Sequence, residues 1–183
     1  MHRMISAFLA AIVALHAPPA RADDWVAFEQ PRAIALMRHA LAPGTGDPQG
    51  FVLGDCSTQR NLDERGRAQA RAVGAALRAR GLRFDVVLTS RWCRARETAE
   101  ELGLAPVRDA PALDSFFGRP DARLPQTEAM QALISGLDGR ALLVTHQVNI
   151  TALTGRSIRS GEVIIVRPDE AGITVLGTVF LAP

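Results

Sequence analysis

Residues 33–39, Ala-Ile-Ala-Leu-Met-Arg-His, are a short apolar run that ends in an arginine and a histidine. Residues 141–146, Ala-Leu-Leu-Val-Thr-His, repeat this arrangement far along the chain, and residues 84–90 lead in the same way into residues 91–94, Arg-Trp-Cys-Arg. Each run has the length and composition of a buried strand. Because ligands of open α/β sheets bind outside the carboxyl ends of the strands, we expect these polar residues to converge on one site. Two histidines beside arginines suit an anion, above all phosphate.

The rest of the chain alternates predicted strands and helices, which is the pattern of an α/β sheet covered by helices. Predicted helices span residues 63–80, 94–102, 127–137 and 147–153, and further predicted strands span residues 162–167 and 173–181. A long loop, residues 42–61, follows the first strand, and residues 105–125 contain four prolines and are expected to be irregular. No repeat or linker divides the chain, so residues 23–183 are expected to form one domain.

Residues 1–22 resemble a cleavable signal peptide. Arg3 supplies positive charge, residues 5–15 are apolar, and residues 20–22, Ala-Arg-Ala, are a small-x-small cleavage signature. The apolar run is shorter than the roughly 20 residues of a spanning helix, so no stable membrane anchor is expected. An amphipathic helix fits less well because the run has no polar face. We therefore predict an exported protein that begins near Asp23 and works in a bacterial periplasm.

The formal net charge of +2 comes from this leader. Arg3 and Arg21 lie within it and no acidic residue does, which leaves 19 of the 21 basic residues against 19 acidic ones. A neutral domain argues against nucleic acid as a partner, because nucleic-acid binding demands a basic excess. The expected partner is a small-molecule or envelope-linked phosphomonoester, and the sequence leaves the oligomeric state open.

The two cysteines, Cys56 and Cys93, both lie in predicted loops. An oxidising compartment favours a disulfide between them, which would brace the loop that presents Arg94. Two alternatives stay open, namely two unpaired buried thiols and a nucleophilic Cys93 that would need a base nearby.

The candidate site residues suit phosphoryl transfer, because the negative charge of a phosphomonoester repels a nucleophile unless cations neutralise it. Arg38 and Arg94 supply forked donors that match phosphate. A neutral His39 can act as a covalent nucleophile when a hydrogen bond holds its other ring nitrogen. A protonated His146 would stabilise charge on the transferring group. A metal site at the two histidines is the weaker alternative, because arginines repel a cation and no third ligand is apparent.

Four segments of the chain resemble, in order, the signatures of the histidine phosphatase superfamily, the phosphoglycerate-mutase-like proteins. Residues 36–40, Leu-Met-Arg-His-Ala, resemble Leu-x-Arg-His-Gly; residues 61–70 resemble Leu-Thr-x-x-Gly-x-x-Gln-Ala; residues 89–99 resemble Ser-Ser-x-x-x-Arg-Ala-x-Gln-Thr-Ala; and residues 144–146 resemble Val-(Ser/Thr)-His. The resemblance implies a three-layer sandwich with a mostly parallel central sheet flanked by helices. It also implies that His39 is the phosphorylated nucleophile and that no metal or organic cofactor takes part. The phosphate pocket would be completed by Arg38, Arg94 and His146.

The proton donor to the leaving group departs from this pattern. Ser115 stands where the family often has a Glu, and Gln147 stands where another branch has an Asp after the second histidine. Asp114 is the nearest candidate for the general acid, and a solvated turn residue is the alternative. Residues 116–117, Phe-Phe, either line the substrate entrance or fill the core.

We therefore expect an exported phosphatase that hydrolyses phosphomonoesters through a phosphohistidine on His39. Export argues against a glycolytic mutase and against a phosphatase of cytoplasmic phosphohistidine proteins, whereas removal of phosphate from lipopolysaccharide core sugars fits the compartment. The alternative is a catalytically weak or inactive phospholigand-binding module of the same fold, suggested by the missing acid.

Overall fold

The computed structural model describes residues 22–170 and 172–181, and in this part of the chain six strands form one sheet in the order β3-β2-β4-β1-β5-β6. The strands are β1 (Ile34–Arg38), β2 (Val86–Thr89), β3 (Val107–Asp109), β4 (Ala141–Thr145), β5 (Val163–Asp169) and β6 (Gly172–Val179). The first four strands pair in parallel, whereas β5 pairs antiparallel with β1 and β6 pairs antiparallel with β5. Five of the six strands therefore run in one direction, which confirms the mostly parallel sheet expected from the sequence.

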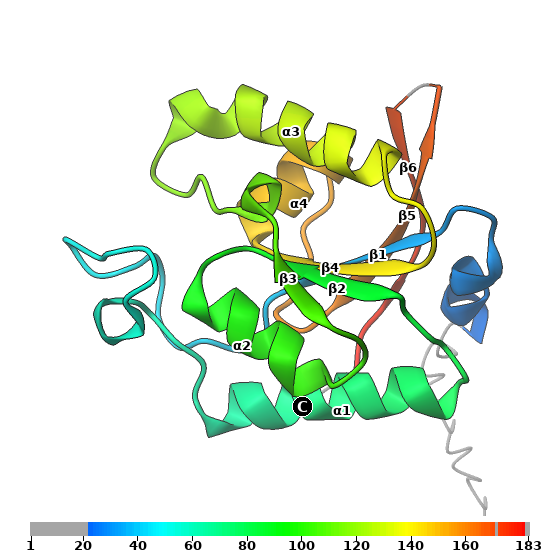
Figure 1. The fold of residues 1–183 in the computed structure, drawn as a ribbon, viewed down its shortest axis with the longest axis horizontal. Coiled ribbons are helices and arrows are strands. Elements are labelled where there is room, and N and C mark those ends of the chain that lie inside the picture. Colours follow the sequence, from blue (N-terminus) through cyan, green and yellow to red (C-terminus); the bar gives the residue numbers. More distant parts are fainter. Residues whose placement is uncertain (1–21, 171, 182–183) are drawn as a thin grey trace, which may run out of the picture.

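Helices cover both faces of this sheet. They are α1 (Glu64–Ala79), α2 (Cys93–Leu102), α3 (Arg123–Ser135) and α4 (Gln147–Thr154), with short 3₁₀ helices at Ala22–Glu29, Cys56–Thr58, Pro111–Leu113 and Pro120–Ala122. In Figure 1, α1 and α2 lie on one face of the sheet, and α3 and α4 lie on the other. The molecule is thus the expected three-layer sandwich.

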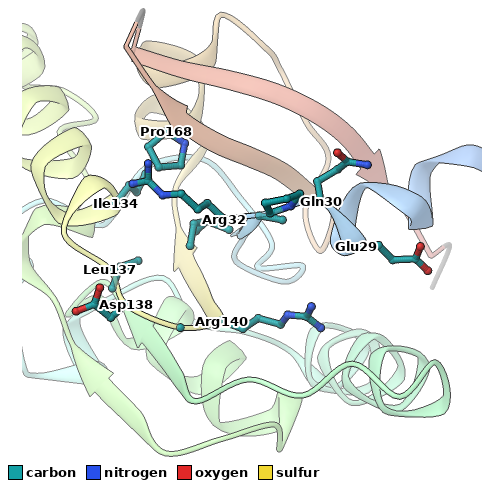
Figure 2. A pocket seen from close by; sticks show the side chains of 12 residues that line it. Glu29, Gln30, Arg32, Ile134, Leu137, Asp138, Arg140 and Pro168 are labelled. Carbon is teal, nitrogen blue, oxygen red and sulfur yellow. The ribbon is translucent and has the colours of Figure 1, made fainter.

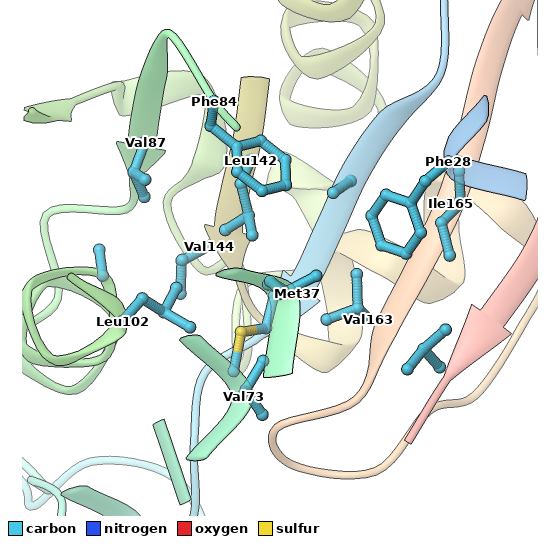
Figure 3. Close-up of a cluster of buried hydrophobic side chains, with 14 of the residues drawn as sticks. Phe28, Met37, Val73, Phe84, Val87, Leu102, Leu142, Val144, Val163 and Ile165 are labelled. Carbon is cyan, nitrogen blue, oxygen red and sulfur yellow. The ribbon is translucent and has the colours of Figure 1, made fainter. Parts of the chain in front are cut away.

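The central strands β1, β2 and β4 bury both of their faces, which is why their sequences are nearly continuous apolar runs rather than alternating ones. In β4, Leu142 and Val144 face one hydrophobic cluster, and Ala141 and Leu143 face the other. Figure 3 shows the first cluster, in which Val73 of α1 and Leu102 of α2 pack with side chains of the sheet. The second cluster includes Met130 and Ile134 of α3 and Ile150 of α4. These two layers of packing fix the sheet edge from which the polar residues project.

The sequence predictions for the regular elements hold with small shifts at the ends. Asp63 caps α1 through a hydrogen bond from the backbone N–H of Gly66, and Gly103 ends α2 in a left-handed conformation. Two differences arise in segments with weak patterns. Residues 107–109 form a three-residue edge strand inside the segment predicted to be irregular, and α3 begins at Arg123, earlier than expected. The predicted leader, residues 1–22, lies outside the described residues except for Ala22.

The two ends of the parallel strands form different surfaces. The carboxyl ends of β1 and β4 lead directly into His39 and His146. The opposite end carries a hollow of about 560 Å³ between the segments that precede β1 and β4. Figure 2 shows this hollow with Gln30, Arg32, Leu137 and Arg140 around it. Within the described ranges, no helix is long and apolar enough to cross a membrane.

Candidate active site

A pocket of about 210 Å³ lies at the carboxyl ends of β1 and β4. Its lining consists of three arginines, two histidines and small, amide or apolar residues: Arg38, His39, Gly44, Thr45, Gly46, Arg60, Arg94, Ser115, Phe117, His146, Gln147 and Val148. None of these lining residues is an Asp or a Glu. The structure therefore brings Arg38, His39, Arg94 and His146 together as predicted, although they come from three separate segments.

His39 lies directly after β1, and its backbone N–H donates to the carbonyl oxygen of Thr145 in the neighbouring strand at 2.9 Å. Its Nδ1 lies 2.8 Å from the carbonyl oxygen of Ala40, and Arg94 Nε donates to its Nε2 at 3.2 Å. This network assigns the proton to Nδ1 and the lone pair to Nε2. Burial and the charge of Arg94 lower the pKa of His39 from 6.5 to about 3. His39 is thus a neutral imidazole with its Nε2 lone pair on the arginine side, as a covalent nucleophile requires.

Residues of the two family-like helices hold the backbone that follows His39. The N–H of Ala40 donates to Thr98 Oγ1 at 3.0 Å, and the N–H of Leu41 donates to Gln69 Oε1 at 3.0 Å. A Cβ on Gly66 would lie 2.0 Å from the carbonyl oxygen of Leu41, so only glycine permits this approach of α1 to the loop. The motif residues in these two helices therefore position the backbone, because they fix the Ala40 carbonyl that orients the His39 ring.

Arg94 occupies the first turn of α2 and is buried between the two histidines and the long loop. Its Nη1 lies 2.6 Å from Asp47 Oδ1 and its Nη2 lies 3.2 Å from Asp47 Oδ2, with side-chain exposures of only 3% and 10%. Trp92 Nε1 also donates to this carboxylate at 3.0 Å. The sequence did not point to Asp47, because the residue lies in an irregular loop where neither periodicity nor a family motif marks it.

Two further arginines complete the cationic wall. Arg38 Nη1 donates to the carbonyl oxygen of Ile158 at 3.1 Å, while its buried Nε has no hydrogen-bond partner among the described residues. Arg60 Nε donates to the carbonyl oxygen of Gly46 at 2.7 Å, and burial and the charge of Arg94 lower its pKa to about 10. An unsatisfied buried guanidinium nitrogen is costly, so Arg38 Nε is a donor that the described residues leave unused. Sequence reasoning missed Arg60; its position immediately before the 61–70 motif was the available signal.

His146 lies next to His39, with ring centroids 5.4 Å apart. Its Nε2 lies 2.8 Å from Ser90 Oγ, and Arg94 Nη2 lies 3.5 Å from its Nδ1. Because the arginine can only donate, the neutral ring carries its proton on Nε2 and donates to Ser90. Burial, His39 and Arg94 lower the pKa of His146 well below 6.5. The expectation of a protonated His146 is therefore corrected for the ligand-free protein, in which low solvation and nearby arginines keep this ring neutral.

Asp114, the expected proton donor, is buried but does not line the pocket. Its Oδ2 forms an ion pair with Arg91 Nη2 at 2.5 Å, and its Oδ1 accepts from the backbone N–H of Arg91 at 2.9 Å. Ser90 Oγ also donates to Oδ1 at 3.4 Å, which links the carboxylate through Ser90 to His146. The alternative of a solvated turn residue does not hold, because Asp114 is buried. This placement supports a positioning role, and proton donation by Asp114 stays a prediction.

The long loop and the start of α2 are joined by a disulfide between Cys56 and Cys93, with the Cα atoms 5.6 Å apart. This pairing confirms the prediction from the sequence and leaves no unpaired cysteine in the described part of the chain. Cys93 also donates its backbone N–H to Gln59 Oε1 at 3.0 Å. The covalent and polar links together hold the loop that carries Asp47 and Arg60 against Arg94.

The remaining candidates divide between pocket and core. Phe117 is exposed at the pocket mouth whereas Phe116 is buried, so each of the two alternatives for this pair applies to one ring. Ser115 and Gln147 line the pocket at the positions where the family often has an acid. Among the described residues, no group of three or more His, Cys, Asp or Glu side chains is arranged to hold a metal ion.

The sequence of this chain matches a known protein family, and the site described above is consistent with that match. Residues 34–131, more than half of the chain, match the model of the histidine phosphatase superfamily (branch 1). A 2,3-bisphosphoglycerate-dependent phosphoglycerate mutase of Mesorhizobium japonicum is 45% identical over 42 residues, or 23% of this chain and 20% of the mutase. A mitochondrial serine/threonine-protein phosphatase of Drosophila virilis is 36% identical over 69 residues, or 38% of this chain and 21% of that protein. The matched segments thus span about a fifth of the length of these curated relatives.

Solved structures share the whole fold at lower identity. The phosphoglycerate mutase of Thermus thermophilus superposes with a TM-score of 0.58 at 23% identity, covering 82% of this chain and 99% of the mutase. The protein histidine phosphatase SixA in complex with tungstate gives a TM-score of 0.54 at 22% identity, covering 80% of this chain and 95% of SixA. Together with the family match and the paired histidines at the strand ends, these likenesses show that the chain belongs to the histidine phosphatase superfamily, branch 1.

Proposed function

We propose that this protein is an exported phosphatase that hydrolyses phosphomonoesters through a phosphohistidine on His39. One observation carries the proposal: His39 is neutral, its Nδ1 is held by Ala40, and its Nε2 lies beside Arg94 in a pocket lined by three guanidinium groups. These arginines and the Asp47 carboxylate leave a net charge of +2 around the neutral histidines. A phosphomonoester dianion complements that charge.

The proposed reaction has two steps, which are transfer of the phosphoryl group to His39 and hydrolysis of the phosphohistidine. The Nε2 lone pair of His39 forms a bond to phosphorus while the bond to the leaving oxygen breaks, and its electron pair departs with that oxygen. The oxygen of a water molecule then bonds to phosphorus, the N–P bond breaks, and its electron pair returns to Nε2. The water proton passes to solvent or to the departed oxyanion. Arg38 and Arg94 offset the charge of the phosphoryl oxygens in both steps, and His146 does so once the bound dianion has raised its pKa and the ring is protonated.

Detection of the phosphohistidine intermediate is the decisive test of this proposal. Protein mixed with phenyl phosphate and quenched in alkali should be heavier by one phosphoryl group, located on the peptide that contains His39. His39→Ala should lose both the label and the turnover, whereas Arg83→Ala, an exposed arginine far from the pocket, should retain both. Turnover by His39→Ala at the wild-type rate would overturn the nucleophile assignment.

The same reaction mixtures also distinguish a phosphatase from two other activities that this fold could have, ligand binding without catalysis and phosphoryl transfer within a mutase. A phospholigand-binding module, which the absence of a lining carboxylate favours, would bind orthophosphate but release none from any ester. A mutase would transfer the phosphoryl group to an alcohol of its substrate, whereas a phosphatase releases inorganic phosphate to water. Measuring phosphate release against total ester consumed distinguishes the three.

The compartment is a separate part of the proposal. Residues 1–22 would direct export and then be cleaved, which would leave the domain in the periplasm, where the Cys56–Cys93 disulfide can form and persist. Expression of the full chain in a Gram-negative host should yield a periplasmic protein whose first residue lies near Asp23. If the protein stayed in the cytoplasm with residues 1–22 attached, the export proposal would be refuted, and the phosphatase proposal would be unaffected.

A further inference from the structure

A second hollow, of about 560 Å³, adjoins the phosphate pocket and shares Gly46, Ser115 and Phe117 with it. A Cβ built on Gly46 would lie 3.3 Å from the Phe117 ring, so this ring packs directly over the boundary between the two cavities. A phosphomonoester that occupies the phosphate pocket has to direct its alcohol side outward, and this hollow lies beside the pocket mouth. We call it the outer hollow.

Three aromatic rings line the outer hollow, namely Phe51, Trp92 and Phe117. The Trp92 ring stands edge-on to His146 with centroids 5.5 Å apart, and the Phe51 ring lies 5.6 Å from Trp92. The aromatic surface therefore starts at a histidine of the phosphate pocket and runs outward. Phe51 and Phe117 are 36% and 57% exposed, although the domain buries most of its large apolar side chains. Exposed rings beside a reactive site supply stacking and apolar contact for a flat group.

The outer hollow also carries one unpaired positive charge. Its carboxylates are engaged, because Asp47 pairs with Arg94 and Asp114 pairs with Arg91. Arg119 donates to the backbone carbonyl of Ser115 at 2.9 Å and forms no ion pair within the described part of the chain. An exposed guanidinium in the lining of an aromatic hollow complements an anionic group on the ligand.

The chemistry of the phosphate pocket favours the same class of ligand. An alkoxide leaves only if it is protonated as the bond breaks, whereas a phenoxide is stable enough to leave with much less help. No carboxylic acid lines the phosphate pocket, so phenolic esters are the monoesters that it can cleave fastest. Aromatic walls and the lack of a proton donor are independent features, and both select a phenolic leaving group.

From these observations we propose that the outer hollow is the leaving-group subsite, and that it selects phosphomonoesters of phenols that carry a second anionic group. Phe51, Trp92 and Phe117 contact the aromatic ring, and Arg119 pairs with the second anion. The inference rests on the proposed phosphatase activity and narrows it to a substrate class. The sugar phosphates that suit the periplasm are then poor substrates, because they offer neither an aromatic ring nor a good leaving group.

The test compares three esters by kcat/KM, which reports all steps up to the departure of the leaving group. They are 4-ethylphenyl phosphate, 4-(2-carboxyethyl)phenyl phosphate and butyl phosphate; the first two phenols have nearly equal acidity because the carboxylate is insulated from the ring. The wild-type protein should prefer the carboxylated ester about threefold to fivefold at low salt, as expected for an exposed ion pair. The preference should shrink as the salt concentration rises.

Variants of Arg119 and Phe117 test which residues cause the preference for the carboxylated aryl ester. Arg119→Gln should abolish the preference for the carboxylated ester, so that the two aryl esters have equal kcat/KM. Phe117→Ala should lower kcat/KM for both aryl esters about tenfold and for butyl phosphate much less, because only the aryl esters lose ring contact. Arg83→Gln and Leu124→Ala, which change an exposed arginine and an exposed apolar residue outside the outer hollow, should behave as wild type.

Each failure has a distinct meaning. His39-dependent turnover of all three esters without a carboxylate preference, or a preference that persists in Arg119→Gln, refutes the subsite and leaves the phosphatase proposal standing. An equal loss for aryl and alkyl esters in Phe117→Ala refutes the aromatic contact. Absence of any His39-dependent turnover refutes the proposed function itself.

Discussion

Asp47→Asn tests how the pocket is electrostatically balanced. In the structure the carboxylate pairs with Arg94 through two contacts, at 2.6 Å and 3.2 Å; the Arg94 side chain is almost fully buried and the Asp47 side chain is mostly buried. Breaking a buried ion pair on one side typically costs 3–5 kcal/mol, because the remaining charge stays buried without compensation. Asn keeps one acceptor oxygen for the guanidinium, so we expect the lower end, about 3 kcal/mol, in the free energy of unfolding.

The same substitution should strengthen anion binding. The Asp47 carboxylate neutralises part of the charge that a phosphate would meet, so its removal leaves Arg94 with a full charge for the ligand. We expect orthophosphate to bind about tenfold more tightly, which is about 1.4 kcal/mol. At a concentration of 100 Kd, the ligand adds about 2.7 kcal/mol to stability, so saturating phosphate should restore most of the stability that the variant loses.

The assay is urea unfolding at neutral pH with and without orthophosphate, beside isothermal titration of phosphate. Asp121→Asn is the matched control, because Asp121 is exposed and outside the pocket. An Asp47→Asn variant as stable as the control would show that the ion pair does not stabilise the fold. A variant that is less stable and also binds phosphate more weakly would refute the charge argument, and would show that Asp47 serves to orient Arg94.

Three further predictions concern the other groups of the site. Burial and Arg94 hold the pKa of His39 at about 3, and burial keeps the pKa of His146 far below 6.5, so neither ring should titrate between about pH 5 and pH 8 in ¹⁵N-histidine NMR of the ligand-free protein. As the pH drops, His39 in the unfolded chain binds a proton near pH 6.5, whereas His39 in the folded protein binds one only near pH 3. The free energy of unfolding should therefore fall as the pH decreases from 6.5 towards 3. Asp114→Asn should slow aryl and alkyl esters equally if the carboxylate only positions Ser90 and His146, whereas a general acid would show a loss of about 10²–10⁴-fold confined to alkyl esters. Replacement of both cysteines by serine should lower the unfolding free energy by about 4 kcal/mol for a sequence separation of 37 residues, and unlike the wild type the variant should not respond to reductant in urea unfolding.

The sequence predicted most of the fold because the strands and helices follow strong local patterns. The runs before His39 and His146 are apolar throughout, since both faces of these strands are buried, and α1 has a capping Asp63 that the chain displays plainly. Edge strand β3 could not be predicted in this way. It has three residues, two of them exposed, and it exists because the edge of β2 offers hydrogen bonds rather than because of its own composition.

Within the site, the sequence predicted the residues that project from regular elements and missed those that come from the long loop. Arg38 is the last residue of β1, and His39 and His146 directly follow β1 and β4, so their meeting at the carboxyl ends of these strands is a consequence of topology. Asp47 and Arg60 reach Arg94 through a loop whose path depends on a disulfide and on tertiary hydrogen bonds. No local pattern encodes such a path. The protonation states of His39 and His146 could not be predicted from the sequence either, because they depend on burial and on the combined electric field of the neighbouring arginines.

The neutral state of His146 in the ligand-free protein changes how the pocket is understood. Three guanidinium groups and the Asp47 carboxylate leave a net charge of +2, and a protonated His146 would raise it to +3 in a buried volume where each added charge is costly. We expect a bound phosphomonoester dianion to cancel this charge and to raise the pKa of His146, and the chain from its Nε2 through Ser90 to Asp114 would then stabilise the imidazolium. We therefore propose that the protonated histidine expected from the sequence belongs to the complex and not to the ligand-free protein. Its proton would then serve the phosphoryl oxygens, so the leaving group would have to depart with little protonation.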